Sequence, residues 1–261
     1  MILRDSSKKP LQIDNYKIIS QLGKGGFGTV YHVQDIHDET KEYALKLLHT
    51  NLNIGRIKRH LEVLKLLNSS RYFLKTHLSK KVLGRMYILF EYSEYKNLKE
   101  KVEQAVVSEE LACKIIKDIA ESLKFLHSHK IIHGDVKAEN ILQKEDRYYL
   151  IDFDVVKKGP LSKTLHIQSD DAFSAPEIYR GVQTYASDVY SLGCTLYYML
   201  SGEYIYGFKD DYEFSRIMYE HLYVKPLQNS KISNNMFELI QKMTEKDYKN
   251  RITIDAILLR V

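Results

Sequence analysis

Three polar side chains recur at short offsets in residues 131–142, a stretch that is apolar at both ends. Asp135 is followed two residues later by Lys137 and five residues later by Asn140. A carboxylate can accept a proton from a hydroxyl group, an ammonium group can neutralise a phosphoryl oxygen, and an amide oxygen can ligate Mg²⁺. Twelve residues after Asn140, an apolar run ends in Asp152, a second carboxylate that could hold the same metal.

The apolar residues on both sides of this stretch indicate a loop held between two buried elements. Upstream, Ser108 can cap a helix that has Glu109 and Glu110 in its first turn, and apolar spacing continues that helix to residue 127. The helix leads the chain directly into the loop. The alternative interpretation is a plain polar turn between two strands.

A second stretch that could contact phosphate lies near the N-terminus. Residues 16–22 alternate as a strand and run into a glycine-rich segment, Gly23-Lys24-Gly25-Gly26-Phe27-Gly28. Glycines allow a tight turn whose backbone N–H groups can approach phosphate oxygens with no Cβ in the way. A dinucleotide-binding fold would place a helix directly afterwards, whereas a β-rich stretch follows here at 29–33. The alternative is a hairpin turn without a ligand.

Lys46 is a single cation in the apolar strand expected over residues 43–48. A cation among apolar residues is costly unless it meets an anion, so the position favours a phosphate contact over a plain surface lysine. A helix is expected over residues 52–67 from apolar spacing at Ile57, Leu61, Leu64 and Leu67. Residues 187–200 are apolar on nearly every face and predict a buried helix, in which the carboxylate of Asp188 needs buried donors.

Taken in order, these segments resemble the protein kinase superfamily. The resemblance covers residues 16 to about 258 and is carried by the segments above together with Asp152-Phe153-Asp154, Ala175-Pro176-Glu177 and Asp247-Tyr248-Lys249-Asn250-Arg251-Ile252-Thr253. It implies an α+β, bilobal fold for a domain at 16–261, with a small β-rich N-lobe at about 1–92 and a larger helical C-lobe at about 93–261. It also implies an enzyme that uses ATP and Mg²⁺ (Mn²⁺ is the alternative metal), with a serine/threonine protein kinase preferred.

The resemblance assigns a role to each candidate residue. Asp135 orients the acceptor hydroxyl and accepts its proton, and Lys137 stabilises charge on the transferred phosphoryl group. Asn140 and Asp152 hold the metal. The positions expected to bind ATP are Leu22, Gly23, Lys24, Gly25, Gly26, Phe27, Gly28, Val30, Ala44, Lys46, Phe90, Glu91 and Ser93.

The resemblance also implies two ion pairs, and the sequence supports only one of them. Arg251 is expected to pair with Glu177. For the other, the family places a glutamate on the helix at 52–67 to pair with the strand lysine, but counting back from the end of that helix puts His60 at this position. Glu62 lies two residues further on, roughly 200° around a helix, so it cannot face Lys46 together with His60. Whether His60, Glu62 or neither faces the lysine is left open.

Three other positions depart from the family pattern. Gly134 stands where the family commonly has an arginine, which binds a phosphorylated loop. We therefore expect activity without an obligatory phosphosite among Ser162, Thr164, Ser169 and Ser174. Asp154 replaces a glycine and adds a carboxylate near the metal. Asp170 stands where many serine/threonine kinases have a threonine, so the preference for the acceptor hydroxyl is left open. Asp170 could also pair with Lys137.

The sequence leaves two alternatives to a protein kinase. The His-Gly-Asp and Ile-Asp-Phe-Asp segments also resemble small-molecule kinases of the aminoglycoside and choline phosphotransferase type. The glycine-rich segment, Glu177, Asp188 and Arg251 favour a protein substrate over a small molecule. A nucleotide-binding pseudokinase scaffold is the other alternative, because His60 and Asp154 depart from the pattern of active enzymes.

Composition and charge narrow the classes of partner. The net charge of +5, from 39 basic and 34 acidic residues, is small and scattered, so neither nucleic acid nor an anionic membrane is expected as a partner. No run approaches the roughly 18 apolar residues of a membrane span. Cys113 and Cys194 lie in apolar helical patterns, which favours buried thiols and a cytoplasmic location, with secretion into a host cell left open. The protein substrate and the oligomeric state are not identified.

Overall fold

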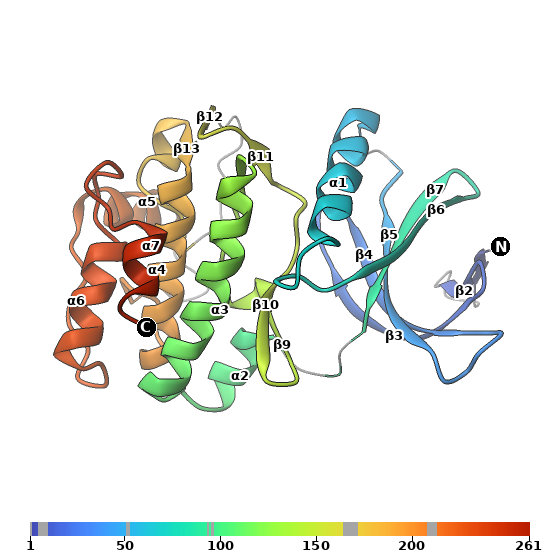
Figure 1. Cartoon of the computed structure of the whole chain (residues 1–261), viewed down its shortest axis with the longest axis horizontal. Helices are drawn as coiled ribbons and strands as arrows, with labels where there is room; N and C mark the ends of the chain where they lie inside the picture. Colours follow the sequence, from blue (N-terminus) through green and yellow to red (C-terminus); the bar gives the residue numbers. More distant parts are fainter. Residues whose placement is uncertain are drawn as a thin grey trace. The chain divides into compact units, whose positions relative to one another are not determined.

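The computed structural model describes residues 2–4, 10–50, 53–92, 94, 97–163, 172–207 and 213–261. The chain forms two compact units, Met1–Glu94 and Tyr95–Val261. The first is built on a β-sheet and the second is mostly helical (Figure 1). The α+β class, with a small β-rich part before a larger helical part, is therefore confirmed. None of the helices in the described residues combines the length and apolar character needed to cross a lipid bilayer.

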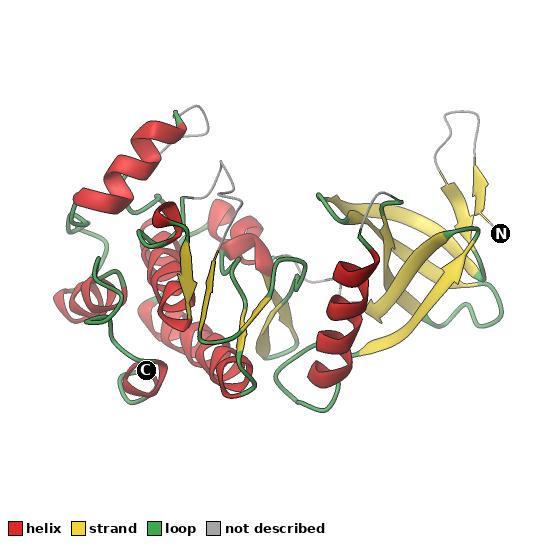
Figure 2. Cartoon of the chain, turned by 90° about the horizontal axis from the view of Figure 1, so that it is seen from above, coloured by secondary structure: helices red, strands yellow, loops and turns green. Residues whose placement is uncertain are grey.

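The first unit contains a seven-stranded sheet in the order β1-β2-β3-β4-β5-β7-β6. All of its neighbouring strands run antiparallel. Figure 2 shows that these strands curl strongly and that a helix lies alongside them. The strands are β1 (Ile2–Arg4), β2 (Pro10–Ile13), β3 (Tyr16–Lys24), β4 (Gly28–Asp35), β5 (Glu42–Leu48), β6 (Thr76–Val82) and β7 (Arg85–Glu91).

The two faces of this sheet differ. Leu45 in β5 lies opposite Tyr31 in β4 and opposite Leu89 in β7, and alternate residues of a strand share a face. That face carries the hydrophobic core of the unit, formed by Ile13, Tyr16, Tyr31, Val33, Leu45, Leu47, Tyr87 and Leu89. Residues at the intervening positions, Lys46 among them, point to the opposite face.

Helix α1 (Ile54–Leu67) begins where Asn53 caps it, because the Asn53 side chain accepts a hydrogen bond from the Gly55 N–H at 2.8 Å. The helix buries one stripe, which consists of His60, Val63, Leu64 and Leu67. At its C-terminus, the Asn68 side chain bonds to both the N–H and the C=O of Thr76, at 2.8 and 2.7 Å. These two bonds fix the end of α1 to the start of β6.

The second unit begins with the helix pair that leads to the polar loop. The helix α3 starts at an N-cap, Ser108, whose side chain accepts from the Leu111 N–H, as the sequence predicts. The helices are α2 (Leu98–Gln104), α3 (Glu109–Ser128), α4 (Tyr185–Ser201), α5 (Phe214–Tyr223), α6 (Asn234–Met243) and α7 (Ile254–Leu258). Short strands pair two by two: β8 (Ile131–Ile132) with β11 (Lys157–Lys158), β9 (Ile141–Lys144) with β10 (Arg147–Leu150), and β12 (Leu161–Lys163) with β13 (Val182–Thr184).

Helix α4 is the buried helix that the sequence predicts, with every residue from Ser187 to Ser201 buried. Three of its hydroxyl groups can donate to the helix backbone. Ser191 and Thr195 donate to the carbonyl oxygens one turn earlier, at 3.1 and 2.8 Å, and Ser201 does the same at 2.8 Å. Others use partners outside the helix, as Ser191 also does with the Phe173 carbonyl oxygen at 2.8 Å, so these buried polar residues of α4 are hydrogen-bonded.

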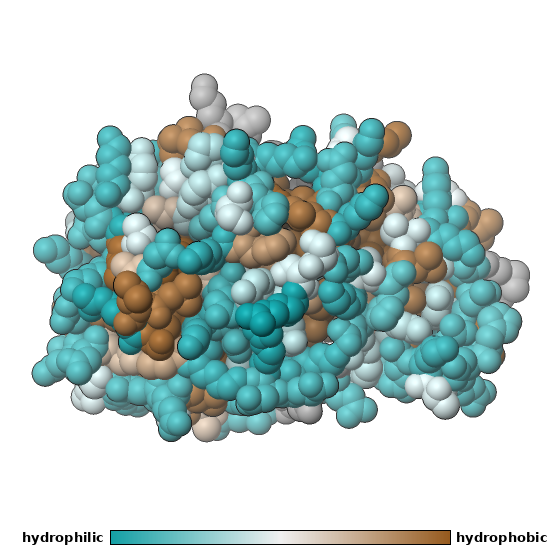
Figure 3. All heavy atoms as spheres, in the orientation of Figure 1, coloured by the Kyte–Doolittle hydropathy of each residue, from teal (hydrophilic) through white to brown (hydrophobic). Residues whose placement is uncertain are grey.

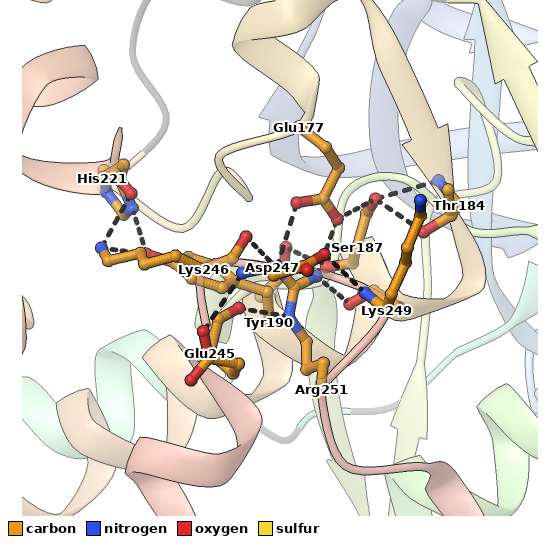
Figure 4. A network of polar contacts seen from close by, with 12 residues as sticks. Glu177, Thr184, Ser187, Tyr190, His221, Glu245, Lys246, Asp247, Lys249 and Arg251 are labelled. Atoms are coloured by element: carbon orange, nitrogen blue, oxygen red, sulfur yellow. Dashed lines mark hydrogen bonds and ion pairs between the residues drawn. The ribbon is translucent and has the colours of Figure 1, made fainter. Parts of the chain in front are cut away.

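A buried polar cluster joins α4, α5 and the loop after α6 (Figure 4). The Tyr190 hydroxyl lies 2.9 Å from His221 Nδ1 and 3.1 Å from the Tyr206 hydroxyl. Lys246 Nζ donates to the Tyr206 hydroxyl at 2.5 Å and to the His221 carbonyl at 2.7 Å. Burial lowers the pKa of Lys246 to about 8 and the pKa of His221 to about 3. The His221 ring is therefore neutral in the folded protein at ordinary pH.

The face drawn in Figure 3 is mostly hydrophilic. Apolar residues gather on it near α7, whose C-cap residue, Leu259, is 88% exposed. Smaller apolar groups show elsewhere on this face among polar and charged ones.

Candidate active site

The polar loop of the second unit brings its three candidate residues into direct contact. Asn140 Nδ2 donates to the carbonyl oxygen and to the Oδ2 carboxylate oxygen of Asp135, both at 2.8 Å. Lys137 Nζ lies 2.8 Å from the other carboxylate oxygen, Oδ1. Both oxygens of Asp135 are therefore held, and its carboxylate has one fixed orientation.

Asp188 holds the backbone of the same loop, as the sequence predicts. Its carboxylate accepts the N–H of His133 at 3.0 Å and the N–H of Gly134 at 2.8 Å. His127 Nε2, at the end of α3, lies 2.8 Å from the same carboxylate. Since Asp188 is only 1% exposed, these three partners supply the donors that a buried carboxylate requires.

His133 is a positioning residue that the sequence pattern did not identify. It is fully buried, its Nε2 lies 3.3 Å from the Ile151 carbonyl oxygen, and its ring meets the Phe153 ring edge-on at 5.2 Å. Burial lowers the pKa of His133 although the carboxylates of Asp188, Asp135 and Asp152 oppose that shift. The ring thus links the polar loop to the segment that carries the second candidate metal ligand.

Asp152 is placed beside the loop by backbone contacts. The preceding residue, Ile151, donates its N–H to the Asn140 carbonyl oxygen at 2.8 Å. Asp152 itself has φ of +65°, a left-handed conformation that is uncommon outside glycine. Such a conformation costs about 1 kcal/mol or more and persists only where the surroundings enforce it.

A metal at this loop would find oxygen ligands. Both N–H groups of the Asn140 amide are used by Asp135, so its Oδ1 is the atom that remains for a cation. Asp152 adds a carboxylate, and hard cations such as Mg²⁺ prefer such oxygens. Among the described residues, no group of three or more His, Cys, Asp and Glu side chains could hold a metal by itself.

An ion pair next to Asn140 also escaped the sequence pattern. Glu139 Oε1 lies 3.1 Å from Lys99 Nζ on α2. Burial is the largest single influence on Lys99 and opposes its charge, but the bond to Glu139 and the nearby negative charges together hold the pKa of Lys99 above its ordinary value. The pair ties α2 to the polar loop.

The expected pair between Glu177 and Arg251 is confirmed (Figure 4). Arg251 Nη1 and Nη2 donate to Glu177 Oε1 and Oε2 at 2.7 and 3.0 Å. Ser187 at the start of α4 donates to the same Oε1 at 2.8 Å. The arginine and glutamate side chains are 0% and 4% exposed, so this is a buried, bidentate pair.

Four of the residues expected to bind ATP share one face of the sheet in the first unit. Lys46 lies opposite Val30, and Ala44, two residues before it, lies opposite Phe90. Their face is the one that does not carry the hydrophobic core. Lys46 is 8% exposed, and its ammonium lies 5.9 Å from the centroid of the Phe27 ring.

The glycine-rich segment forms the turn between β3 and β4. A Cβ added to Gly25 or Gly26 would meet no atom within 4 Å, but one added to Gly28 would lie 2.4 Å from the Leu47 carbonyl oxygen. Gly28 is therefore required for the close approach of β4 and β5. Gly25 and Gly26 leave the space beside the turn open, as a phosphate-binding turn requires.

Other expected residues of the first unit lie nearby in the sheet. Leu22 is in β3 and 48% exposed, and Glu91 is the last residue of β7. On α1, His60 is 5% exposed with the buried stripe, whereas Glu62 is exposed to solvent. The helix register that we expect from Asn68 is thus confirmed, and Glu62 does not lie on the buried side.

Several predictions fall on residues outside the described ranges. These residues are Ser93, Thr164, Ser169 and Asp170, and the side chain of Ser162 is likewise not described. The contact of Ser93 with ATP and the pairing of Lys137 with Asp170 stay predictions. Ser174 is described, and it is 5% exposed.

Comparison with known proteins agrees with this geometry. Residues 16–260 match the model of the protein kinase domain. The chain is 26% identical over 260 residues to the probable serine/threonine-protein kinase zyg-1 of Caenorhabditis elegans, covering 97% of this chain and 34% of that protein. It is 27% identical over 254 residues to the probable serine/threonine-protein kinase PknB of Lactococcus lactis, covering 92% and 40%.

A third relative is closer to this chain in length. The testis-specific serine/threonine-protein kinase 2 of the mouse is 26% identical over 266 residues, which covers 95% of this chain and 73% of that protein. The chain spans only about a third to two fifths of the first two relatives. Family membership implies ATP and a divalent cation as cofactors. By its polar loop, its buried Glu177–Arg251 pair and a domain match over nearly its whole length, the chain belongs to the protein kinase family.

Proposed function

We propose that this protein transfers the γ-phosphoryl group of Mg–ATP to a serine or threonine hydroxyl of a protein substrate. The observation that carries the proposal is the set of contacts among Asp135, Lys137 and Asn140, which hold a carboxylate, an ammonium group and an amide together within one short loop. Phosphoryl transfer depends mainly on positioning and electrostatics, and this loop supplies both.

Asp135 acts on the acceptor hydroxyl. Its carboxylate accepts hydrogen bonds, so it can orient a hydroxyl group and take its proton as the new P–O bond forms. Lys137, 2.8 Å from Asp135 Oδ1, is close enough to share its ammonium between this carboxylate and the oxygens of the transferred group. Its positive charge offsets the negative charge that develops there.

Asn140 and Asp152 would hold the metal, and their oxygen donors suit Mg²⁺, with Mn²⁺ as the alternative. When bound, the metal neutralises phosphate charge. Lys46 would contact the α- and β-phosphates, and the turn formed by residues 23–28 would cover them. The open space beside Gly25 and Gly26 supports this role.

The buried pair of Glu177 and Arg251 supports a protein kinase over the small-molecule alternative. This pair and the Asp188 contacts are the features that the chain shares with protein kinases and that the aminoglycoside-type resemblance does not include.

The test is transfer from γ-labelled ATP to generic protein substrates in the presence of Mg²⁺. We expect wild-type transfer, and a loss of roughly 100-fold or more in Asp135→Asn and in Lys46→Met. Asp146→Asn is the matched control, because Asp146 is an acid of the same unit with a side chain that is 96% exposed. It should keep the wild-type rate.

Thermal-shift titration with ATP and Mg²⁺ separates the other functions. Nucleotide binding without transfer to any protein would identify a scaffold and overturn the proposal. Transfer that occurs only to amino sugars or small alcohols would overturn the protein substrate. Equal transfer by wild type and Asp135→Asn would remove Asp135 from the mechanism.

A further inference from the structure

Gly134 and Gln183 make an unusually close approach. Gly134 precedes Asp135 and has φ of +81°. A Cβ built on it would lie 2.3 Å from Gln183 Nε2 and 3.3 Å from Gln183 Cδ. The end of the Gln183 side chain therefore fills the space into which a side chain at position 134 would project. Gln183 is 4% exposed, so it is packed on its other sides as well.

The same peptide is held from a second direction. The Gly134 N–H donates to Asp188 Oδ1 at 2.8 Å. Gln183 and Asp188 are five residues apart, at β13 and the first turn of α4. One short stretch of the second unit thus contacts the residue before Asp135 through both a carboxylate and an amide side chain.

The backbone of Gln183 faces the segment that follows Asp152. In the antiparallel pair of β12 and β13, Gln183 lies opposite Ser162. The earlier part of this segment, β11, pairs with β8, which leads into the polar loop, and the Gly159 N–H donates to the Lys130 carbonyl oxygen at 2.7 Å. Backbone pairing therefore attaches residues 157–163 both to the strand before the loop and to the strand that carries Gln183.

We infer that Gln183 is a positioning residue, which transmits the order of residues 157–163 to Asp135 by filling the space beside Gly134. This inference rests on the proposed function and adds a regulatory contact to it. The contact is made by an uncharged side chain and by backbone pairing, so it needs no phosphate group. In this chain, Gly134 has no side chain, and the Gln183 amide occupies the space that a side chain there would need.

The test compares Gln183→Ala, Gln183→Met and Val182→Ala. Ala empties the space beside Gly134, whereas Met restores most of its length and volume. Val182 is the matched control, because the neighbouring residue of a strand points to the opposite face. We expect Gln183→Ala to lower kcat about tenfold or more with less than a threefold change in KM for ATP. Gln183→Met should recover kcat to within about threefold of wild type, and Val182→Ala should leave kcat within about threefold.

A double-mutant cycle with Gly134→Ala tests the contact itself. The strain of an alanine at φ of +81° is present in both backgrounds and cancels in the cycle. The overlap with Gln183 exists only in the wild-type background. Gly134→Ala should therefore lower the unfolding midpoint and kcat more in wild type than in Gln183→Ala. Additive effects would overturn the inference.

Hydrogen exchange tests the positioning role of Gln183 without relying on kinase activity. In Gln183→Ala, amide exchange should increase together in residues 131–137 and 157–163, and in Val182→Ala it should not. A wild-type protein without kinase activity would remove the proposed function but leave the exchange and stability measurements valid. If Gln183→Ala leaves exchange in residues 131–137 unchanged, Gln183 has no positioning role.

Discussion

The buried pair of Glu177 and Arg251 gives a quantitative prediction for Glu177→Gln. The substitution keeps the shape of the side chain but removes its charge. An amide offers one oxygen and one NH₂ group, so one guanidinium N–H that now donates to a carboxylate oxygen at 2.7 or 3.0 Å will face another donor. Arg251 keeps its bonds to the carbonyl oxygens of Ala186 and Glu245, both at 2.8 Å or less.

The expected loss follows from the burial of both groups. Removing one partner of a buried ion pair costs about 3–5 kcal/mol, because the remaining charge is left without compensation. Arg251 keeps its hydrogen bonds to backbone carbonyl oxygens, so we expect the loss in the free energy of unfolding to lie near the lower end of this range, at about 3 kcal/mol. Glu238→Gln is the control, since Glu238 pairs with Lys242 on the surface of the same unit with side chains 56% and 41% exposed. Exposed pairs contribute about 0–1 kcal/mol.

The assay is urea unfolding followed by circular dichroism, with the free energy of unfolding compared among wild type and both variants. Glu177→Gln should lower the midpoint strongly, and Glu238→Gln should change it little. A second cycle with Arg251→Met should show coupling of about 2 kcal/mol or more, because the double variant leaves no buried charge. A loss below about 1 kcal/mol for Glu177→Gln, or additivity in the cycle, would refute the account of this pair.

Three further predictions follow from other features. Gly28→Ala should destabilise the first unit by about 1–3 kcal/mol, because its Cβ would overlap the Leu47 carbonyl, whereas Gly26→Ala should be neutral in the same unfolding assay; equal effects would contradict this. The pKa of His221 falls from 6.5 to about 3 on folding. The contribution of this shift to the free energy of unfolding is therefore complete above pH 6.5. It is lost as the pH falls from 6.5 to 3, by up to about 5 kcal/mol. The acid limb of the pH–stability curve should therefore be shallower in His221→Gln, and an unchanged slope would argue against a neutral buried ring. Phosphatase-treated protein should keep its kinase activity, consistent with Gly134 and with the 5% exposure of Ser174, and an obligatory phosphosite found by mass spectrometry would contradict this prediction.

The sequence predicted those parts of the site whose geometry is local. Asp135, Lys137 and Asn140 lie within one short loop, so their mutual contacts follow from their spacing. The buried helix α4 was predicted because its apolar residues cover nearly every face. The donors to Asp188 were anticipated for the same reason: a carboxylate on a fully buried helix must be satisfied within the fold.

Contacts between segments that are distant in the sequence cannot be predicted from residue spacing. The distance between Gly134 and Gln183 depends on how β13 packs, and the pairing of β12 with β13 had no recognisable pattern in a polar stretch. The contact of His127 with Asp188 likewise joins two helices that are far apart in the chain. Periodicity identifies which faces are buried, but it does not identify which buried groups meet.

The glycine-rich segment shows a different limit of sequence reasoning. The sequence pattern predicts one phosphate-binding role for all of its glycines. In the structure, Gly28 has a packing role, since Leu47 leaves no room for a Cβ, whereas Gly25 and Gly26 have open space beside them. Glycines with different physical roles give the same letter in the sequence.

The contacts of Asp188 restrict how this protein can be controlled. Moving the His133 and Gly134 amides away would leave a carboxylate that is 1% exposed without two of its three partners, at a cost of several kcal/mol. A large rearrangement of the loop is therefore too rare to serve as an off state. We expect active and inactive forms of this kinase to share the same loop backbone, and any switch to operate on the elements that approach it.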